Sequence, residues 1–235
     1  MSEISALIDA HWPFAPSAET DWLLELADGS IEPEMVAGFD LGEVTTSTGG
    51  GLGRDRHPGP GWRRLRWAEL ARRTGDPLVP EGLTPSCRCF PSSRKKGSWP
   101  LSIHPPTEGS LDRETWHQPI EVLIRHSQAG ADTPCSAYYN PLTVGAVDFD
   151  NLHVRTGRLG DAHLLYDNPE TDFSPSNLWP TNRSWVTGTD YDLWATKVVG
   201  PAPLIEALLG DPEMTMIAPS GRSGVGYAAY WLYAT

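Results

Sequence analysis

Two aspartates and a histidine lie close together in the middle of the chain, at Asp148, Asp150 and His153. Carboxylate and imidazole groups are ligands that zinc, manganese and iron accept in proteins. On a strand, Asp148 and Asp150 share a face and could chelate one ion, whereas His153 falls on the opposite face. The competing interpretation is a polar turn in which Asp150 and Asn151 bond the local backbone. The cluster supports a metal-dependent hydrolase as an alternative function.

The cysteines and glycines form no recognised chemical motif. Cys87 and Cys89 are separated by one residue, whereas a zinc knuckle uses two, and Cys135 is distant in the sequence. The glycines at 49–51 lack the Gly-Lys-Ser/Thr that closes a phosphate-binding loop. We therefore expect structural cysteines and no resident cofactor.

The most distinctive stretch is a tryptophan-rich block at residues 178–194. We predict a strand over 184–192, in which Trp185, Thr187 and Thr189 share the more apolar face and point to the core. That register places Arg183 on the core side as well, unless a bulge at Gly188 shifts it. An Arg between two tryptophans can stack on a ring and still pair with a carboxylate.

The block has two interpretations, which differ in what its aromatic side chains do. In the first, they lock a strand against a helix. In the second, they form a binding surface, since Trp, Tyr and Arg dominate interaction hot spots. The candidate binding residues are Trp179, Asn182, Arg183, Trp185, Asp190, Asp192 and Trp194.

The order Trp-Pro-x-x-Arg-Ser-Trp at 179–185, followed by Thr-Asp-x-Asp at 189–192, resembles a pattern in a family of uncharacterised actinobacterial proteins. The resemblance extends from about Trp62 to the helix that follows Gly200, and the tail from Gly221 lies outside it. The family has no established activity. The resemblance therefore implies a shared fold and no mechanism.

Hydrophobic spacing predicts short helices at 67–74, at 203–210 and from Thr115 onward. Gly75 follows the first of these helices at the position that glycine favours, and Gly210 lies at the end of the helix at 203–210. Thr115 and Gln118 match a capping box, and Trp116, Ile120 and Leu123 then fall on one face. The helices are too few and too irregularly placed for a wound parallel sheet.

Strands are predicted where apolar residues alternate between turn signals. These stretches are 22–27, 99–103, 135–139, 184–192 and 214–218. Residues 152–166 could form a hairpin around 157–160, although 162–166 could instead be helical. The predicted class is α+β, with a mixed or mostly antiparallel sheet packed by a few short helices.

We predict a single α+β domain over residues 1–235, because a chain of this length can bury a sizeable core. Residues 45–60 are rich in Gly, Pro, Ser and Thr, which predicts a flexible loop. The aromatic tail at 221–235 could add an edge strand or remain a loose terminus.

The charge and the hydropathy of the chain indicate which kinds of partner and which location to expect. The net charge of -12 disfavours a nucleic acid, although residues 54–96 carry eleven bases and four acids. No stretch approaches the length of a membrane helix, and no signal peptide is evident. We expect a cytoplasmic, non-enzymatic protein-interaction module of the immunity kind, in which an acidic protein neutralises a basic partner.

Overall fold

The computed structural model describes the helices and strands of the chain and a few of their connections. The described residues are 3–13, 63–65, 69, 72–73, 75, 103–104, 109–111, 113–140, 153–167, 174–189, 195–211, 216–217, 225–229 and 232–234. The predicted strand at 22–27 and the predicted loop at 45–60 lie outside these residues.

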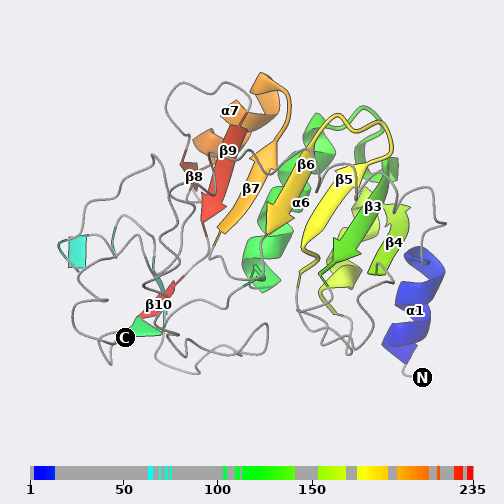
Figure 1. The fold of residues 1–235 in the computed structure, drawn as a ribbon, viewed down its shortest axis with the longest axis horizontal. Helices are drawn as coiled ribbons and strands as arrows, with labels where there is room; N and C mark the ends of the chain where they lie inside the picture. Colours follow the sequence, from blue (N-terminus) through cyan, green and yellow to red (C-terminus); the bar gives the residue numbers. More distant parts are fainter. Residues whose placement is uncertain are drawn as a thin grey trace, which may run out of the picture.

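A seven-stranded antiparallel sheet, in the order β4-β3-β5-β6-β7-β9-β8, forms the centre of the fold (Figure 1). Its strands are β3 (Pro134–Tyr139), β4 (His153–Arg158), β5 (Asn177–Pro180), β6 (Val186–Thr189), β7 (Ala195–Val199), β8 (Met216–Ile217) and β9 (Val225–Ala229). A separate three-stranded antiparallel sheet contains β1 (Arg63–Leu65), β10 (Leu232–Ala234) and β2 (Ile103–His104). The antiparallel pairing confirms the predicted α+β class.

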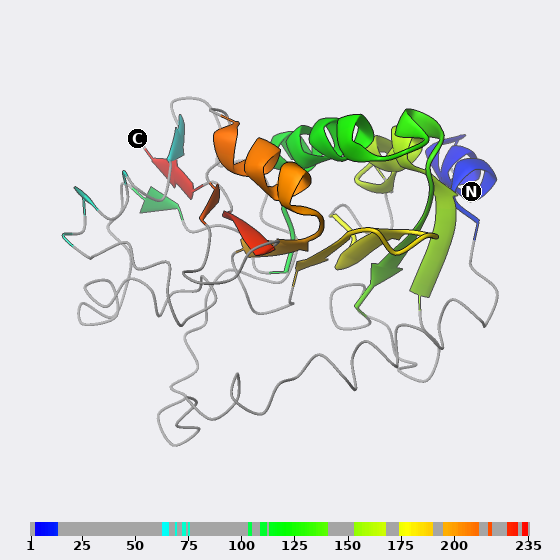
Figure 2. The same ribbon diagram turned by 90° about the horizontal axis from the view of Figure 1, so that it is seen from above.

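The helices gather on one face of the seven-stranded sheet (Figure 2). They are α1 (Glu3–His11), α6 (Arg113–His126), the 3-10 helices η3 (Gly130–Asp132) and η4 (Leu159–Leu165), and α7 (Ala202–Gly210). No helix among the described residues is long and apolar enough to cross a membrane.

Alternation along the strands divides the interior into two parts. On β3, Cys135, Ala137 and Tyr139 join the large cluster beneath the helices. Tyr138 points the other way and packs against a smaller cluster built on Val154 and Trp179. Since successive side chains of a strand point to opposite faces, the period of two alone assigns these residues to their clusters.

Helix α6 presents the predicted face to the core, but it begins earlier than we expected. Trp116, Ile120 and Leu123 are buried, as their spacing predicts. The helix starts at Arg113, so Thr115 lies inside its first turn and is not the N-cap. The predicted capping box is therefore wrong, because Thr115 is the third residue of the helix and does not precede it.

Helix α7 and the segment around 69–75 agree with the sequence patterns. Helix α7 ends at Gly210 and buries Leu204, Ile205 and Leu208. Glu69, Arg72 and Arg73 are helical, and Gly75 has φ 74°, the left-handed conformation predicted after this helix.

Residues 152–166 do not form the hairpin that we considered. Strand β4 pairs along its whole length with β3, and the chain then enters η4. The partner of β4 is the strand that precedes it, so the turn residues at 157–160 do not join it to its partner. The helical alternative for 162–166 is closer to the structure, although η4 is a 3-10 helix.

The aromatic tail contributes to both sheets. Strand β9 lies between β7 and β8, and β10 lies between β1 and β2. These inner positions differ from the edge strand or loose terminus that we expected from the sequence. The predicted strands at 135–139 and 214–218 correspond to β3 and β8.

Candidate functional site

The described part of the tryptophan-rich block, residues 178–189, forms the antiparallel hairpin of β5 and β6, in which Leu178 is paired with Thr187. Trp185, Thr187 and Thr189 are buried, which confirms the predicted core face. Trp179 lies in the smaller cluster on the other face of the sheet. The two tryptophans of the motif therefore pack on opposite faces and hold the hairpin from both sides.

Trp185 connects the hairpin to α6 and to the end of β7. Its side chain is 2% exposed, and its Nε1 donates a hydrogen bond of 3.0 Å to Ser127 Oγ. A Cβ on Gly200 would lie 3.0 Å from Trp185 Cβ, so the backbone after β7 packs directly on this residue. Trp185 therefore has a structural role in the described part of the chain.

Trp179 is fully buried, at 0% exposure. It contacts Val154 from β4, and Tyr138 and Val186 pack against the same pair. The contact with β4 reaches across β3, because β3 lies between β4 and β5. Burial also raises the pKa of the Tyr138 hydroxyl. This interior position makes Trp179 a packing residue.

The turn between the tryptophans, Thr181–Ser184, is exposed and is held by backbone hydrogen bonds; we call it the Arg183 turn. Arg183 N donates to Pro180 O at 2.8 Å, and Thr181 N donates to Pro134 O at 2.9 Å. Asn182 Oδ1 accepts from Ser184 N at 3.1 Å. Arg183 has φ 55°, and among the described residues it is the only non-glycine with positive φ. The predicted core-side position of Arg183 is wrong, because the strand begins after this turn.

The other predicted site residues are only partly described. Asp190, Asp192 and Trp194 of the predicted binding surface lie outside the described residues, as do Asp148 and Asp150 of the predicted metal cluster. His153 is half-buried at the start of β4, opposite Tyr139. The described part of the chain contains no group of three potential metal ligands.

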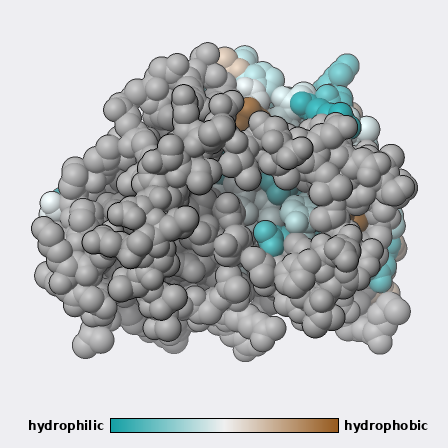
Figure 3. Space-filling view, in the orientation of Figure 1, coloured by the Kyte–Doolittle hydropathy of each residue, from teal (hydrophilic) through white to brown (hydrophobic). Residues whose placement is uncertain are grey.

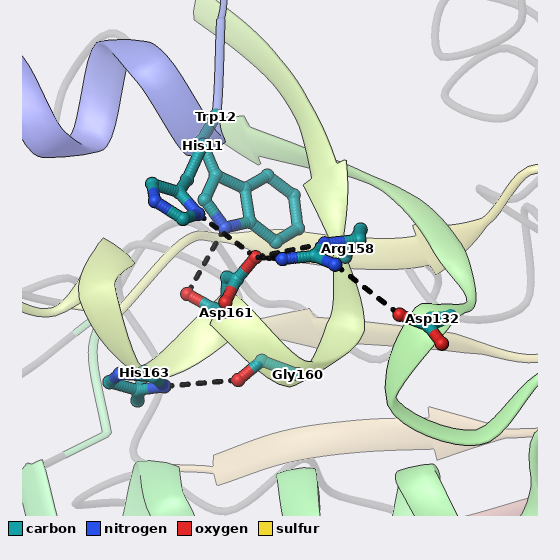
Figure 4. A network of polar contacts seen from close by, with 7 residues as sticks. All are labelled: His11, Trp12, Asp132, Arg158, Gly160, Asp161 and His163. Carbon is teal, nitrogen blue, oxygen red and sulfur yellow. Dashed lines mark hydrogen bonds and ion pairs between the residues drawn. The ribbon is translucent and has the colours of Figure 1, made fainter.

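A second polar cluster, which sequence reasoning missed, surrounds Asp161 on η4 (Figure 4). Asp161 Oδ2 lies 3.0 Å from His11 Nδ1 and accepts hydrogen bonds from Arg158 Nε and Nη2 at 3.2 and 2.9 Å. Burial raises the pKa of Asp161, but the hydrogen bonds and charges of His11 and Arg158 outweigh it and lower the pKa below 3.8. The Asp161 carboxylate is the shared partner of the His11 imidazole and the Arg158 guanidinium.

Helix α1 docks beside this cluster on the outer edge of β4. Trp12 is fully buried, and its Nε1 donates to Asp161 O at 3.1 Å. Arg155 is buried too, and its Nη1 donates to Asp9 Oδ1 at 2.7 Å and to Trp12 O at 2.9 Å. Thr156 N donates to Pro13 O at 2.8 Å, so the segment after α1 covers the edge of the sheet.

A third cluster joins the first turns of α6 to the end of η4. The rings of His117 and His163 stack with their centroids 6.1 Å apart. Arg113 forms an ion pair with Asp167 and lies over the ring of Tyr166, 5.2 Å from its centroid. Each of these pairs joins α6 to η4 or to the two residues that follow η4. The two elements are far apart in the sequence, so residue spacing could not have predicted that they meet.

On the face shown in Figure 3, the described residues at the upper right are largely hydrophilic. Leu209, at 38% exposure, is the exposed large hydrophobic residue of the described ranges. Comparisons of the chain with family models, with curated proteins and with solved structures each find no match.

Proposed function

We propose that this protein is a non-enzymatic protein-interaction module and that the Arg183 turn is its contact surface. The observation that carries this proposal is the backbone of Arg183, which has φ 55° at an exposed position. A left-handed conformation costs a residue with a Cβ about 1–2 kcal/mol. Such strain persists where the surrounding structure enforces it, and it is concentrated at binding and catalytic sites.

The anchoring of the hairpin supports the same conclusion. Trp179 and Trp185 are buried on opposite faces, and Thr181 is bonded to the start of β3. Asn182 and Arg183 are exposed between these anchors. Because hydrogen bonds hold the backbone of the turn, binding there costs little further backbone entropy, which favours affinity.

The guanidinium of Arg183 indicates which chemical group the partner must contribute. A guanidinium binds a carboxylate through two parallel hydrogen bonds or stacks on an aromatic ring. The net charge of -12 attracts a basic protein at long range. The partner that fits both features is a basic protein with a carboxylate at the centre of its contact surface, as expected for an immunity-like complex.

We place this interaction in the cytoplasm. The thiol of Cys135 is free and buried in the core. An odd number of cysteines, here three, is unlike the disulfide frameworks of secreted domains.

The test compares Arg183→Asn with the wild-type protein as bait in extracts of the cells that produce it. Asparagine tolerates the left-handed backbone, so this variant keeps the turn and removes the guanidinium. We expect a specific basic protein to be enriched by the wild type at low salt and at least tenfold less by Arg183→Asn. Arg125→Ala, which changes an exposed arginine at the end of α6, is the matched control and should retain the partner.

Two results would overturn the proposal. One is that no protein is lost from the bound fraction when Arg183 is replaced. The other is that Arg125→Ala causes the same loss, because the binding would then depend on total positive charge and not on the turn.

A further inference from the structure

Helix η4 packs against both α1 and α6, and an imidazole is present at each of these two contacts. On one side, His11 Nδ1 lies 3.0 Å from Asp161 Oδ2. On the other side, His163 stacks on His117 of α6. Each contact also has an indole hydrogen bond: Trp12 Nε1 donates to Asp161 O at 3.1 Å, and Trp116 Nε1 donates to Ala162 O at 3.0 Å.

The two contacts differ in the charges that face each imidazole. His11 Nδ1 faces the carboxylate of Asp161, 3.0 Å from Oδ2. His117 faces His163 on η4 and Arg113 on its own helix, and of its charged neighbours only Glu121 favours a proton. Arg113 is in turn paired with Asp167 and packed on Tyr166, which holds it beside the stacked rings.

These surroundings make a proton on His117 unfavourable in the folded chain. Burial lowers the pKa of His117 first, and the charges of His163 and Arg113 lower it further, against the opposing effect of Glu121. The hydrogen bond between His163 Nδ1 and Gly160 O, 3.1 Å long, holds the second ring in place beneath the first. A proton therefore binds more readily when the two rings have separated.

We propose that the stacked His117–His163 pair makes the packing of η4 on α6 sensitive to pH, so that mild acid opens this contact while α1 stays on η4. The opening begins as the pH falls below about 6.5, the ordinary pKa of histidine, because an unstacked His117 takes up protons from that point. At the contact with α1, the side chain of Asp161 stays ionised over the same pH range, because its pKa lies below 3.8.

The two indole N–H groups allow each contact to be observed separately. We would record 1H–15N spectra of the full chain between pH 8 and pH 5, with the indole signals assigned by single Trp→Phe variants. We expect the Trp116 signal to move to its position in the unfolded chain below about pH 6.5, because its Nε1 then loses Ala162 O. The signals of Trp12 and of Trp185, whose Nε1 is bonded to Ser127, should not move to their positions in the unfolded chain.

His117→Phe is the decisive variant, because phenylalanine keeps an aromatic ring on His163 and cannot take up a proton. In this variant the Trp116 signal should no longer depend on pH. His126→Phe, at the exposed end of the same helix, is the matched control and should behave as the wild type does. His163→Phe gives a second test from the other side of the stack.

The proposal is overturned if the Trp116 signal is constant down to pH 5 in the wild type. It is equally overturned if that signal changes in the same way in His117→Phe and in His163→Phe, because the pH sensitivity would then arise elsewhere. Movement of the Trp12 signal to its position in the unfolded chain would show that α1 is released as well, which contradicts the selective opening of one contact.

Discussion

Gly157 on β4 provides the space in which Trp12 of α1 is buried. A Cβ at this position would lie 2.5 Å from Trp12 Cδ2 and closer still to the carbonyl oxygen of His11. Since real Cβ atoms do not approach so closely, Gly157→Ala must displace α1 from the sheet edge. We expect a loss of about 1–3 kcal/mol in the free energy of unfolding, measured by urea denaturation.

The matched control is Gly210→Ala at the end of α7, where a Cβ would meet nothing within 4 Å. This variant should be neutral or more stable by up to about 1 kcal/mol, because alanine restricts the unfolded chain. Equal stability of the two variants would mean that Trp12 is not packed on Gly157 in solution.

Burial makes the thiol of Cys135 unreactive towards alkylating reagents. Its side chain is 1% exposed, and burial raises the pKa of its thiol to about 12. Only the thiolate attacks alkylating reagents. We expect no labelling of Cys135 by iodoacetamide at pH 8 in the native protein, and complete labelling in urea, as followed by peptide mass spectrometry. Native labelling as fast as that in urea would contradict the buried position.

At the scale of the elements, the bond from Trp185 to Ser127 joins the β5–β6 hairpin to the end of α6. The donor and acceptor are 3.0 Å apart, and the indole is buried. A double-mutant cycle with Ser127→Ala and Trp185→Phe should show a coupling of about 0.5–1.5 kcal/mol in the free energy of unfolding. The measurement is chemical denaturation of the four proteins.

The control cycle combines Trp185→Phe with Ser184→Ala. Ser184 is exposed and is adjacent to Trp185 in sequence. That pair should show no coupling beyond the error of the measurement. If both cycles give the same value, the hydrogen bond does not connect the hairpin to α6.

At the scale of the whole molecule, Asp161 should make stability depend on pH in acid. Its pKa is lower in the folded chain than the ordinary 3.8, because the hydrogen bonds from His11 and Arg158 outweigh the effect of burial. A carboxyl of this kind stabilises the fold above its unfolded pKa, and the contribution is lost as the pH falls through the folded pKa. We therefore expect the free energy of unfolding to fall below about pH 4.

Asp161→Asn should be less stable than the wild type at pH 7 and should show a flatter pH profile below pH 4, as measured by urea denaturation across this range. Asp132→Asn is the control, since Asp132 is 79% exposed where it meets Arg158. A wild-type profile that matches that of Asp161→Asn would show that Asp161 has no folded partner.

The sequence alone determined the class of the fold and the faces of several elements. The alternation of Trp185, Thr187 and Thr189 predicted the core face of β6, and the spacing of Trp116, Ile120 and Leu123 predicted that of α6. These patterns predict a core face because the residues buried on one side of a strand recur at every second position, and those on one side of a helix recur every three or four positions.

Only the tertiary structure decided which elements meet. Strand β4 pairs with β3 and not with the segment that follows it, and β9 lies inside the sheet. It also decided that Arg183 lies on an exposed turn, and that His117 and His163 share a contact. Such contacts join residues that are far apart in the chain, so their energies depend on how the whole core is packed and leave no local pattern in the sequence.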